Sequence, residues 1–176
     1  MIKLQSYYLI IDNILEELYK KESVLFEKEL CERAIVFRFA YHLQKVFEGS
    51  WYFVDCDYNS SCFQDEKWNW IGGKWKPIAD LETWEITWRF VDIIVHKRLL
   101  PESWQDSSVS DLICFECKKR DNKTKEWMKK DINNLRVLTQ NYWYEYWFHL
   151  IFWKTKERCI IDVYHDWEKL QTIINP

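Results

Sequence analysis

The stretch Asp111-Leu112-Ile113-Cys114-Phe115-Glu116-Cys117-Lys118-Lys119 decides how the chain folds. It begins as a run of apolar, β-branched and aromatic residues, which is typical of a buried strand, and it ends in charged residues. Side chains of a strand alternate between its faces, so Glu116 and Lys118 point the same way, roughly 6 to 7 Å apart. A carboxylate and an ammonium group are costly to bury without a partner. The stretch therefore indicates either a surface ion pair or a site for a metal ion and a substrate.

The composition is typical of one globular domain. The chain has 176 residues, of which 48% are hydrophobic and 30% charged, so we expect a single domain over residues 1–176. A net charge of −3 gives no overall attraction for nucleic acid or for anionic lipid. No apolar run is long enough to cross a bilayer, and Asp12 and Glu16 interrupt any secretory pattern. We expect a protein of the reducing cytoplasm, with no membrane partner.

The six cysteines do not form a metal-binding pattern. Cys114 and Cys117 have CxxC spacing, but three positions along a strand place two side chains on opposite faces. Cys56 and Cys62 flank a turn-like segment, and no second CxxC completes a four-ligand zinc site. The sequence therefore predicts buried free thiols.

Two helices are predicted before the first strand. Over residues 4–21 apolar side chains recur at helical spacing. Ser23 is expected to cap a second helix that runs to about Phe47 and ends near Gly49. Glu32 lies on the apolar stripe of this second helix, so it is either ion-paired or directed into a site.

The later segments alternate between strands and loops. Residues 59–82 are polar and rich in tryptophan, which indicates a long loop or hairpin whose tryptophans either cover the core or stack on bases. Asp92 is the single acid within an apolar strand, so it needs a partner. The predicted strands cover residues 51–58, 84–97, 111–119, 142–153 and 158–164, and a terminal helix is predicted over residues 165–173.

Residues 125–139 predict a helix with a basic face. Lys125, Lys129, Lys130 and Arg136 form the best local basic patch of the chain, either as a solvated surface or as a contact for nucleic acid. Charge reversal at Lys129 and Lys130 is expected to weaken nucleic-acid binding and to flatten its salt dependence.

The order of these elements indicates an α/β or α+β domain around a mixed sheet. Asp92 and Glu116 lie toward the ends of successive strands. If these strands pair as an antiparallel hairpin, we expect a distortion near one end to bring Asp92 beside Glu116.

The pair Val91-Asp92, followed by Glu116-Cys117-Lys118, resembles the motif of the PD-(D/E)XK nuclease superfamily, which has the restriction-endonuclease-like fold. The resemblance spans roughly residues 25–153, with Val91 at a position where the family often has proline. It implies a mixed β-sheet flanked by helices and a metal-dependent phosphodiester hydrolase. The family's catalytic roles fall on Asp92, Glu116 and Lys118, with Glu32 as a supplementary acid on the first core helix.

The residue types suit this chemistry. Mg²⁺ prefers oxygen ligands, so Asp92, Glu116 and the backbone carbonyl of Cys117 would hold Mg²⁺, or Mn²⁺ in its place. Glu32 would bind a second ion or a metal-bound water. Lys118 would orient the attacking water or stabilise the developing charge.

Two further residues near the motif have supporting roles. Asp131 is expected to be an outer partner that positions a base or its own helix. His96 is expected to be a core histidine rather than a general base.

Three hypotheses follow for the function. The first is a Mg²⁺-dependent nuclease, acting on DNA in defence, repair or mobile-element biology. The second is a non-catalytic protein of the same fold that binds nucleic acid or a protein partner. The third is a dimerisation module that uses the exposed aromatic residues. Homodimers are common, and cutting two strands calls for two sites. The intact Asp92, Glu116 and Lys118 favour the first, whereas the acidic net charge favours the second.

Overall fold

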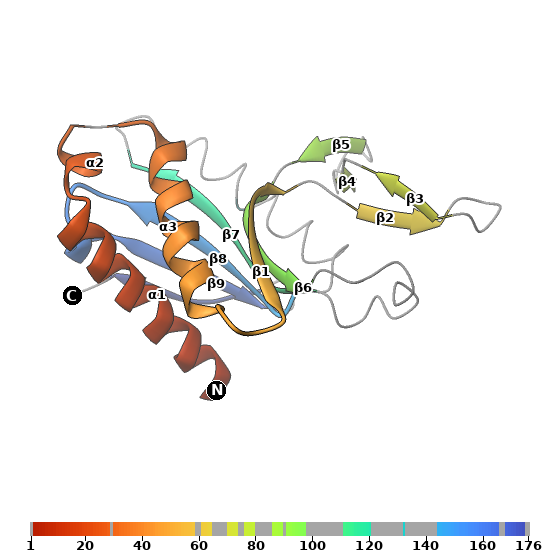
Figure 1. Cartoon of the computed structure of the whole chain (residues 1–176), viewed down its shortest axis with the longest axis horizontal. Helices are drawn as coiled ribbons and strands as arrows, with labels where there is room; N and C mark the ends of the chain where they lie inside the picture. The colour runs from red at the N-terminus through yellow and green to blue at the C-terminus, as the bar shows by residue number, and fades with distance from the viewer. Residues whose placement is uncertain are drawn as a thin grey trace.

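The structure is a computed structural model of the whole chain. It describes residues 2–28, 30–58, 61–64, 70–73, 76–79, 86–89, 91–97, 111–120, 132, 144–165 and 168–174. Within these ranges a six-stranded mixed sheet packs against helices (Figure 1). The helices are α1 (Ile2–Lys21), α2 (Val24–Glu27) and α3 (Glu32–Val46); the strands are β1 (Tyr52–Tyr58), β6 (Val91–Lys97), β7 (Asp111–Lys119), β8 (Tyr146–Phe152), β9 (Ile160–His165) and β10 (Glu168–Ile174). The predicted α+β class with a mixed sheet is confirmed.

The sheet has the strand order β1-β6-β7-β8-β9-β10. Strands β7 and β8 run parallel, and the other neighbouring strands are antiparallel. Parallel neighbours require a crossover connection, which here runs between Arg120 and Tyr144. Ile132, the described residue of this connection, is helical and packs against an apolar cluster on the sheet. The rest of the helix predicted over residues 125–139 lies outside the described residues.

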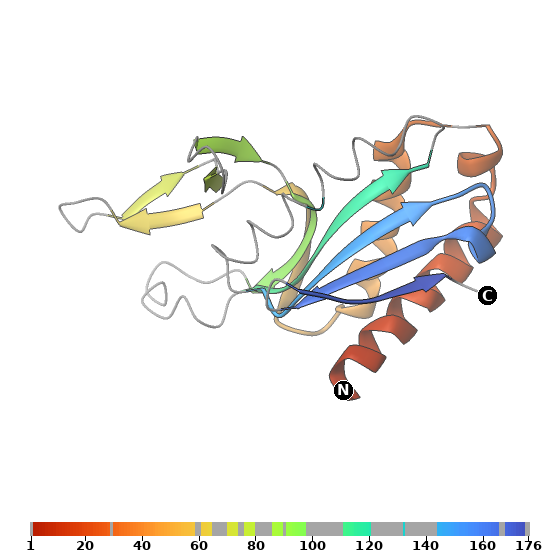
Figure 2. The same cartoon turned by 180° about the vertical axis from the view of Figure 1, so that it is seen from behind.

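Two further hairpins lie beyond the β1–β6 side of the sheet (Figures 1 and 2). One pairs β2 (Ser61–Gln64) with β3 (Trp70–Gly73), and the other pairs β4 (Lys76–Ala79) with β5 (Ile86–Arg89). Residues 59–82 therefore contain hairpin strands, while Trp68 and Trp75 fall outside the described residues. The single strand predicted over residues 84–97 is wrong, because β5 pairs with β4 whereas β6 lies between β1 and β7.

The main core lies between α1, α3 and one face of the sheet (Figure 1). The helical apolar positions predicted from the sequence are buried there, including Ile11, Leu18 and Phe39. A smaller cluster covers the opposite face and comprises Val91, Ile94, Cys114, Tyr144, Trp147 and Tyr164. Both faces of the central strands are thus apolar, which explains their nearly continuous hydrophobic sequences.

The second predicted helix is in fact two helices. Helix α2 ends at Glu27 and α3 begins at Glu32, because Cys31 has an extended backbone with φ −61° and ψ 147°. Ser23 precedes α2 but makes no side-chain capping bond. The break matters for function because it makes Glu32 the first residue of a helix rather than a residue in its middle.

The predicted terminal helix is also wrong. Residues 168–174 form β10, which pairs antiparallel with β9. The tertiary context explains this outcome, because β10 satisfies the backbone groups that an unpaired β9 edge would expose. β-Branched Thr172 and Ile173 also suit a strand.

Five cysteines among the described residues are free thiols. Cys117 faces the main core and Cys114 faces the smaller cluster, as the strand period predicts. Cys31 is exposed, so the prediction of burial is wrong for that residue. Within the described ranges, no helix is long and apolar enough to span a membrane.

Candidate functional site

Asp92 and Glu116 lie opposite one another on β6 and β7. The antiparallel ladder pairs Ile93 with Phe115, so one further step along it aligns Asp92 with Glu116. The two carboxyl groups are hydrogen-bonded. Strands β6 and β7 do pair antiparallel, which was the condition for the expected contact between Asp92 and Glu116. The expected distortion is not at this end, because the register shift lies between Val95 and His96.

Asp92 accepts a hydrogen bond from the backbone N–H of Cys117, with 2.7 Å between nitrogen and Oδ2. Burial raises the pKa of the Asp92 carboxyl above its ordinary value, and the bond from Cys117 opposes that change. A hydrogen bond between two carboxyl groups requires a proton on one of them. The pair of acids therefore needs either a shared proton or a cation.

Glu32 and Lys118 meet at the end of β7. The Glu32 carboxylate accepts a hydrogen bond from the backbone N–H of Lys119 at 2.8 Å, and it pairs with Lys118 Nζ at 3.5 Å. Lys119 Nζ donates to the backbone oxygen of Leu30 at 3.0 Å. These contacts hold the start of α3 against the end of β7. Glu32 is thus ion-paired, and its partner is the lysine of the motif.

The four residues predicted to be catalytic act on one another electrostatically. Lys118 lowers the pKa of Asp92, whereas the negative charge of Glu32 raises it. In the part of the chain that the structure describes, no three His, Cys, Asp or Glu side chains form a ready-made metal site. The Asp92–Glu116 oxygen pair nevertheless fits a hard divalent cation, which would replace the proton between the two acids.

A second group of polar residues continues the row across the sheet. Glu116 on β7 is paired with His149 on β8, and His149 is paired with Asp162 on β9. Paired residues share a face of the sheet. Four polar residues are buried in the described part of the chain, namely His96, Glu116, His149 and Asp162. Three of the four therefore belong to one row.

Asp162 is surrounded by donors. Its Oδ1 lies 2.7 Å from Lys169 Nζ and accepts a hydrogen bond from Thr172 Oγ1 at 2.7 Å. His149 Nδ1 lies 3.8 Å from Oδ2. Burial alone would raise the pKa of the Asp162 carboxyl, but the nearby His149 ring and the contacts with Lys169 and Thr172 lower it to about 2. Asp162 is therefore a fully compensated buried anion.

The sequence interpretation missed His149 and Asp162, although a signal was present. His149 is the one polar residue in Tyr146–Phe152, and Asp162 is the one acid in Ile160–His165. The same signal, a lone charged group in an apolar strand, had identified Asp92.

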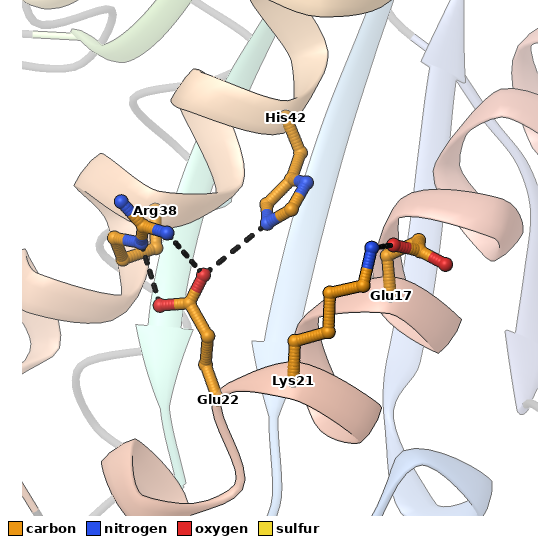
Figure 3. A network of polar contacts seen from close by, with 5 residues as sticks. All are labelled: Glu17, Lys21, Glu22, Arg38 and His42. Carbon is orange, nitrogen blue, oxygen red and sulfur yellow. Dashed lines mark hydrogen bonds and ion pairs between the residues drawn. The ribbon is translucent and has the colours of Figure 1, made fainter.

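A polar network holds the helix that carries Glu32 (Figure 3). Arg38 donates to both oxygens of the Glu22 carboxylate, at 2.5 Å each, and His42 Nε2 lies 3.3 Å from Oε1. Glu22 follows α1, whereas Arg38 and His42 lie on α3, so the network ties these two helices together. It contributes to the placement of Glu32 without being part of the site.

His96 pairs with Asp55 on the neighbouring strand β1, with 2.7 Å between Nε2 and Oδ2. It is buried, which agrees with the prediction of a core histidine. The remaining predicted residues, Lys125, Lys129, Lys130, Asp131 and Arg136, lie outside the described residues. Comparison of the chain with family models, curated proteins and solved structures finds no match.

Proposed function

We propose that the protein is a metal-dependent nuclease that hydrolyses phosphodiester bonds, with DNA as its substrate. The observation that carries this proposal is the hydrogen-bonded pair of acids, Asp92 and Glu116, beside the Glu32–Lys118 ion pair. Two touching carboxyl groups are unfavourable unless they bind something positive, because Glu116 is buried and Asp92 is largely shielded from water. Either a proton or a divalent cation between the two carboxyl groups removes the repulsion. Binding of a cation also gives the pair of acids a function.

Each residue then has a distinct role. Asp92 and Glu116 hold the cation, with the backbone carbonyl of Cys117 as a further oxygen ligand. When bound, Mg²⁺ neutralises charge on the phosphate and makes water a better nucleophile. Lys118 positions that water or stabilises the charge that develops on the phosphate. Glu32 holds Lys118 in place and can become a further ligand if Lys118 turns to the phosphate.

The proposal is tested by a cleavage assay on single-stranded DNA, duplex DNA and RNA, with Mg²⁺ or Mn²⁺. Asp92→Asn keeps an acceptor for the Cys117 N–H but removes the negative charge. We expect it to lower metal-dependent cleavage of DNA by about 10³-fold. Glu17→Gln, which changes a partly exposed acid on α1 paired with Lys21 and remote from the site, should cleave like the wild-type chain. Equal cleavage by wild type and Asp92→Asn would contradict the proposal.

The second candidate is a non-catalytic protein of this fold that binds nucleic acid or a protein partner. The Glu32–Lys118 ion pair favours it, because the motif lysine already has a carboxylate partner. The two candidates differ in one outcome. A non-catalytic protein would bind one of these nucleic acids, or a partner protein, and leave every substrate intact with either cation.

A further inference from the structure

His149 is a buried histidine whose ring lacks hydrogen bonds. Its exposed fraction is 0%, and neither Nδ1 nor Nε2 has a hydrogen-bond partner in the structure. Asp162 Oδ2 lies 3.8 Å from Nδ1, which is beyond hydrogen-bond distance. Burying a polar group without a partner costs free energy, so an imidazole in this state calls for an explanation.

The position of His149 on the sheet offers an explanation for the ring without hydrogen bonds. Strand β8 lies between β7 and β9, and its residue His149 is paired with Glu116 on one side and with Asp162 on the other. Neighbouring strands lie about 4.8 Å apart. The two ring nitrogens lie on either side of Cε1, so a ring that presents Nδ1 to Asp162 directs Nε2 away from β9. Nε2 therefore does not face the Asp162 carboxylate and is available to another ligand.

The surroundings of Asp162 suit a supporting role. Lys169 and Thr172 both contact Oδ1, which leaves Oδ2 for His149. In proteins, a histidine that binds a metal through one nitrogen usually donates the other N–H to a carboxylate, which fixes the ring.

We propose that His149 is a nitrogen ligand of the cation held by Asp92 and Glu116, with Asp162 as the carboxylate that orients its ring. The inference rests on the metal site of the proposed function and deepens it. A nitrogen donor favours transition-metal ions over Mg²⁺. The site therefore takes Mn²⁺ or Co²⁺ more tightly than Mg²⁺. In the described part of the chain, Asp92, Glu116 and His149 do not form a ready-made metal site. Binding of the cation therefore includes a rotation of the Glu116 side chain toward His149.

Pulsed electron paramagnetic resonance of Mn²⁺ bound to the full chain tests the ligand directly. We expect modulation from one ¹⁴N nucleus in the wild-type spectrum. The modulation should vanish in His149→Gln and persist in His42→Gln, which changes a histidine that also adjoins a carboxylate but lies on α3 (Figure 3). Mn²⁺ bound without nitrogen modulation would overturn the role of His149 alone. If no Mn²⁺ binds to the wild-type chain, both the proposed metal site and the role of His149 are wrong.

Affinities provide the second readout, which does not depend on cleavage. Wild type should bind Mn²⁺ at least about tenfold more tightly than Mg²⁺ by calorimetric titration. Asp162→Asn should lower the Mn²⁺ affinity about tenfold or more, but the Mg²⁺ affinity by less than about threefold. Equal losses for the two ions would show a merely structural role and overturn the proposal. The wild-type spectrum and affinities settle the case even if His149→Gln does not fold.

Discussion

Asp92 and Asp162 occupy the same polar row of one sheet, yet their surroundings are opposite. Asp162 is contacted by Lys169, Thr172 and His149, and its pKa is lowered to about 2. Asp92 faces another acid, Glu116, and burial raises its pKa. Both acids lie in an environment that disfavours charge, but only Asp162 has donors sufficient to offset it. An acid in a core is thus a structural element when its partners are complete, and a candidate ligand when they are not.

The two acids should affect stability in opposite ways as pH changes. Because the pKa of Asp162 is lowered, its contribution to stability is present above about pH 4 and is lost as pH falls toward 2. The raised pKa of Asp92 acts in the other direction. Its contribution is largest below the ordinary value of 3.8 and is lost as pH rises through the pKa of the folded state. At neutral pH, without metal, ionising Asp92 therefore opposes folding.

The largest difference is expected between two neighbouring lysines, in the loss of DNA cleavage when each is replaced. Lys118→Met should lower DNA cleavage by about 10²-fold or more, because it removes the cation beside the acid pair. Lys119→Met is the matched control, since Lys119 Nζ contacts the backbone oxygen of Leu30. Steady-state cleavage rates at saturating Mg²⁺ provide the measurement. Equal losses for both variants would mean that Lys118 has no special role.

The next effect is protection by metal. A cation at a concentration one hundred times its Kd should stabilise the wild-type chain by about 2.7 kcal/mol. Asp92→Asn should show little of this gain, whereas Asp162→Asn should retain most of the gain from Mg²⁺. Thermal unfolding with and without Mg²⁺ measures the difference. Similar stabilisation of Asp92→Asn and wild type would place the cation elsewhere.

A smaller effect is expected on the stability of the metal-free chain. Asp162→Asn should lower the free energy of unfolding at pH 7 by about 2 kcal/mol, because it leaves Lys169 without its buried anion. Asp92→Asn should leave the stability unchanged or raise it, since it relieves the contact between two acids. Urea unfolding at pH 7 checks both variants. A loss of stability in Asp92→Asn comparable to that in Asp162→Asn would contradict the contrast between the two acids.

The smallest effect concerns an acid that is paired but lies near the surface. Glu22→Gln should destabilise the chain by about 1 kcal/mol or less, because Arg38 is partly exposed and water screens the pair (Figure 3). The pKa of Glu22 is lowered, mainly by the hydrogen bond from Arg38. The loss should therefore be seen at neutral pH and shrink as pH falls below the ordinary value of 4.5 toward the lower pKa of the folded state. A loss as large as that of Asp162→Asn would show that exposure does not weaken this pair.

Much of the fold was predictable because the core strands are apolar on both faces. Residues 111–119 and the strand at 51–58 are confirmed, and so is the first helix, where apolar spacing and burial agree. The errors occur where contacts between segments distant in sequence determine the secondary structure. The β-branched residues of β10 only weakly favour a strand over a helix, and its strand conformation depends on pairing with the edge of β9. The break before Glu32 likewise depends on the contacts of Lys119 with Leu30 and Glu32.

The candidate site was predictable to the extent that it consists of lone charges in apolar strands. Asp92 and Glu116 were identified on that basis, and the structure brings them into contact. His149 and Asp162 carry the same signal, but the row becomes visible only when the parallel pairing of β7 and β8 aligns Glu116 with His149. That pairing joins strands separated by a long connection, so local sequence patterns could not reveal it. The catalytic roles stay predictions.

A crystal structure of the chain grown with Mn²⁺ tests the central claim most directly. Anomalous scattering should show an ion about 2.2 Å from carboxylate oxygens of both Asp92 and Glu116, with the hydrogen bond between the two acids lost. An ion bound elsewhere, with Asp92 and Glu116 still sharing a proton, would contradict the account.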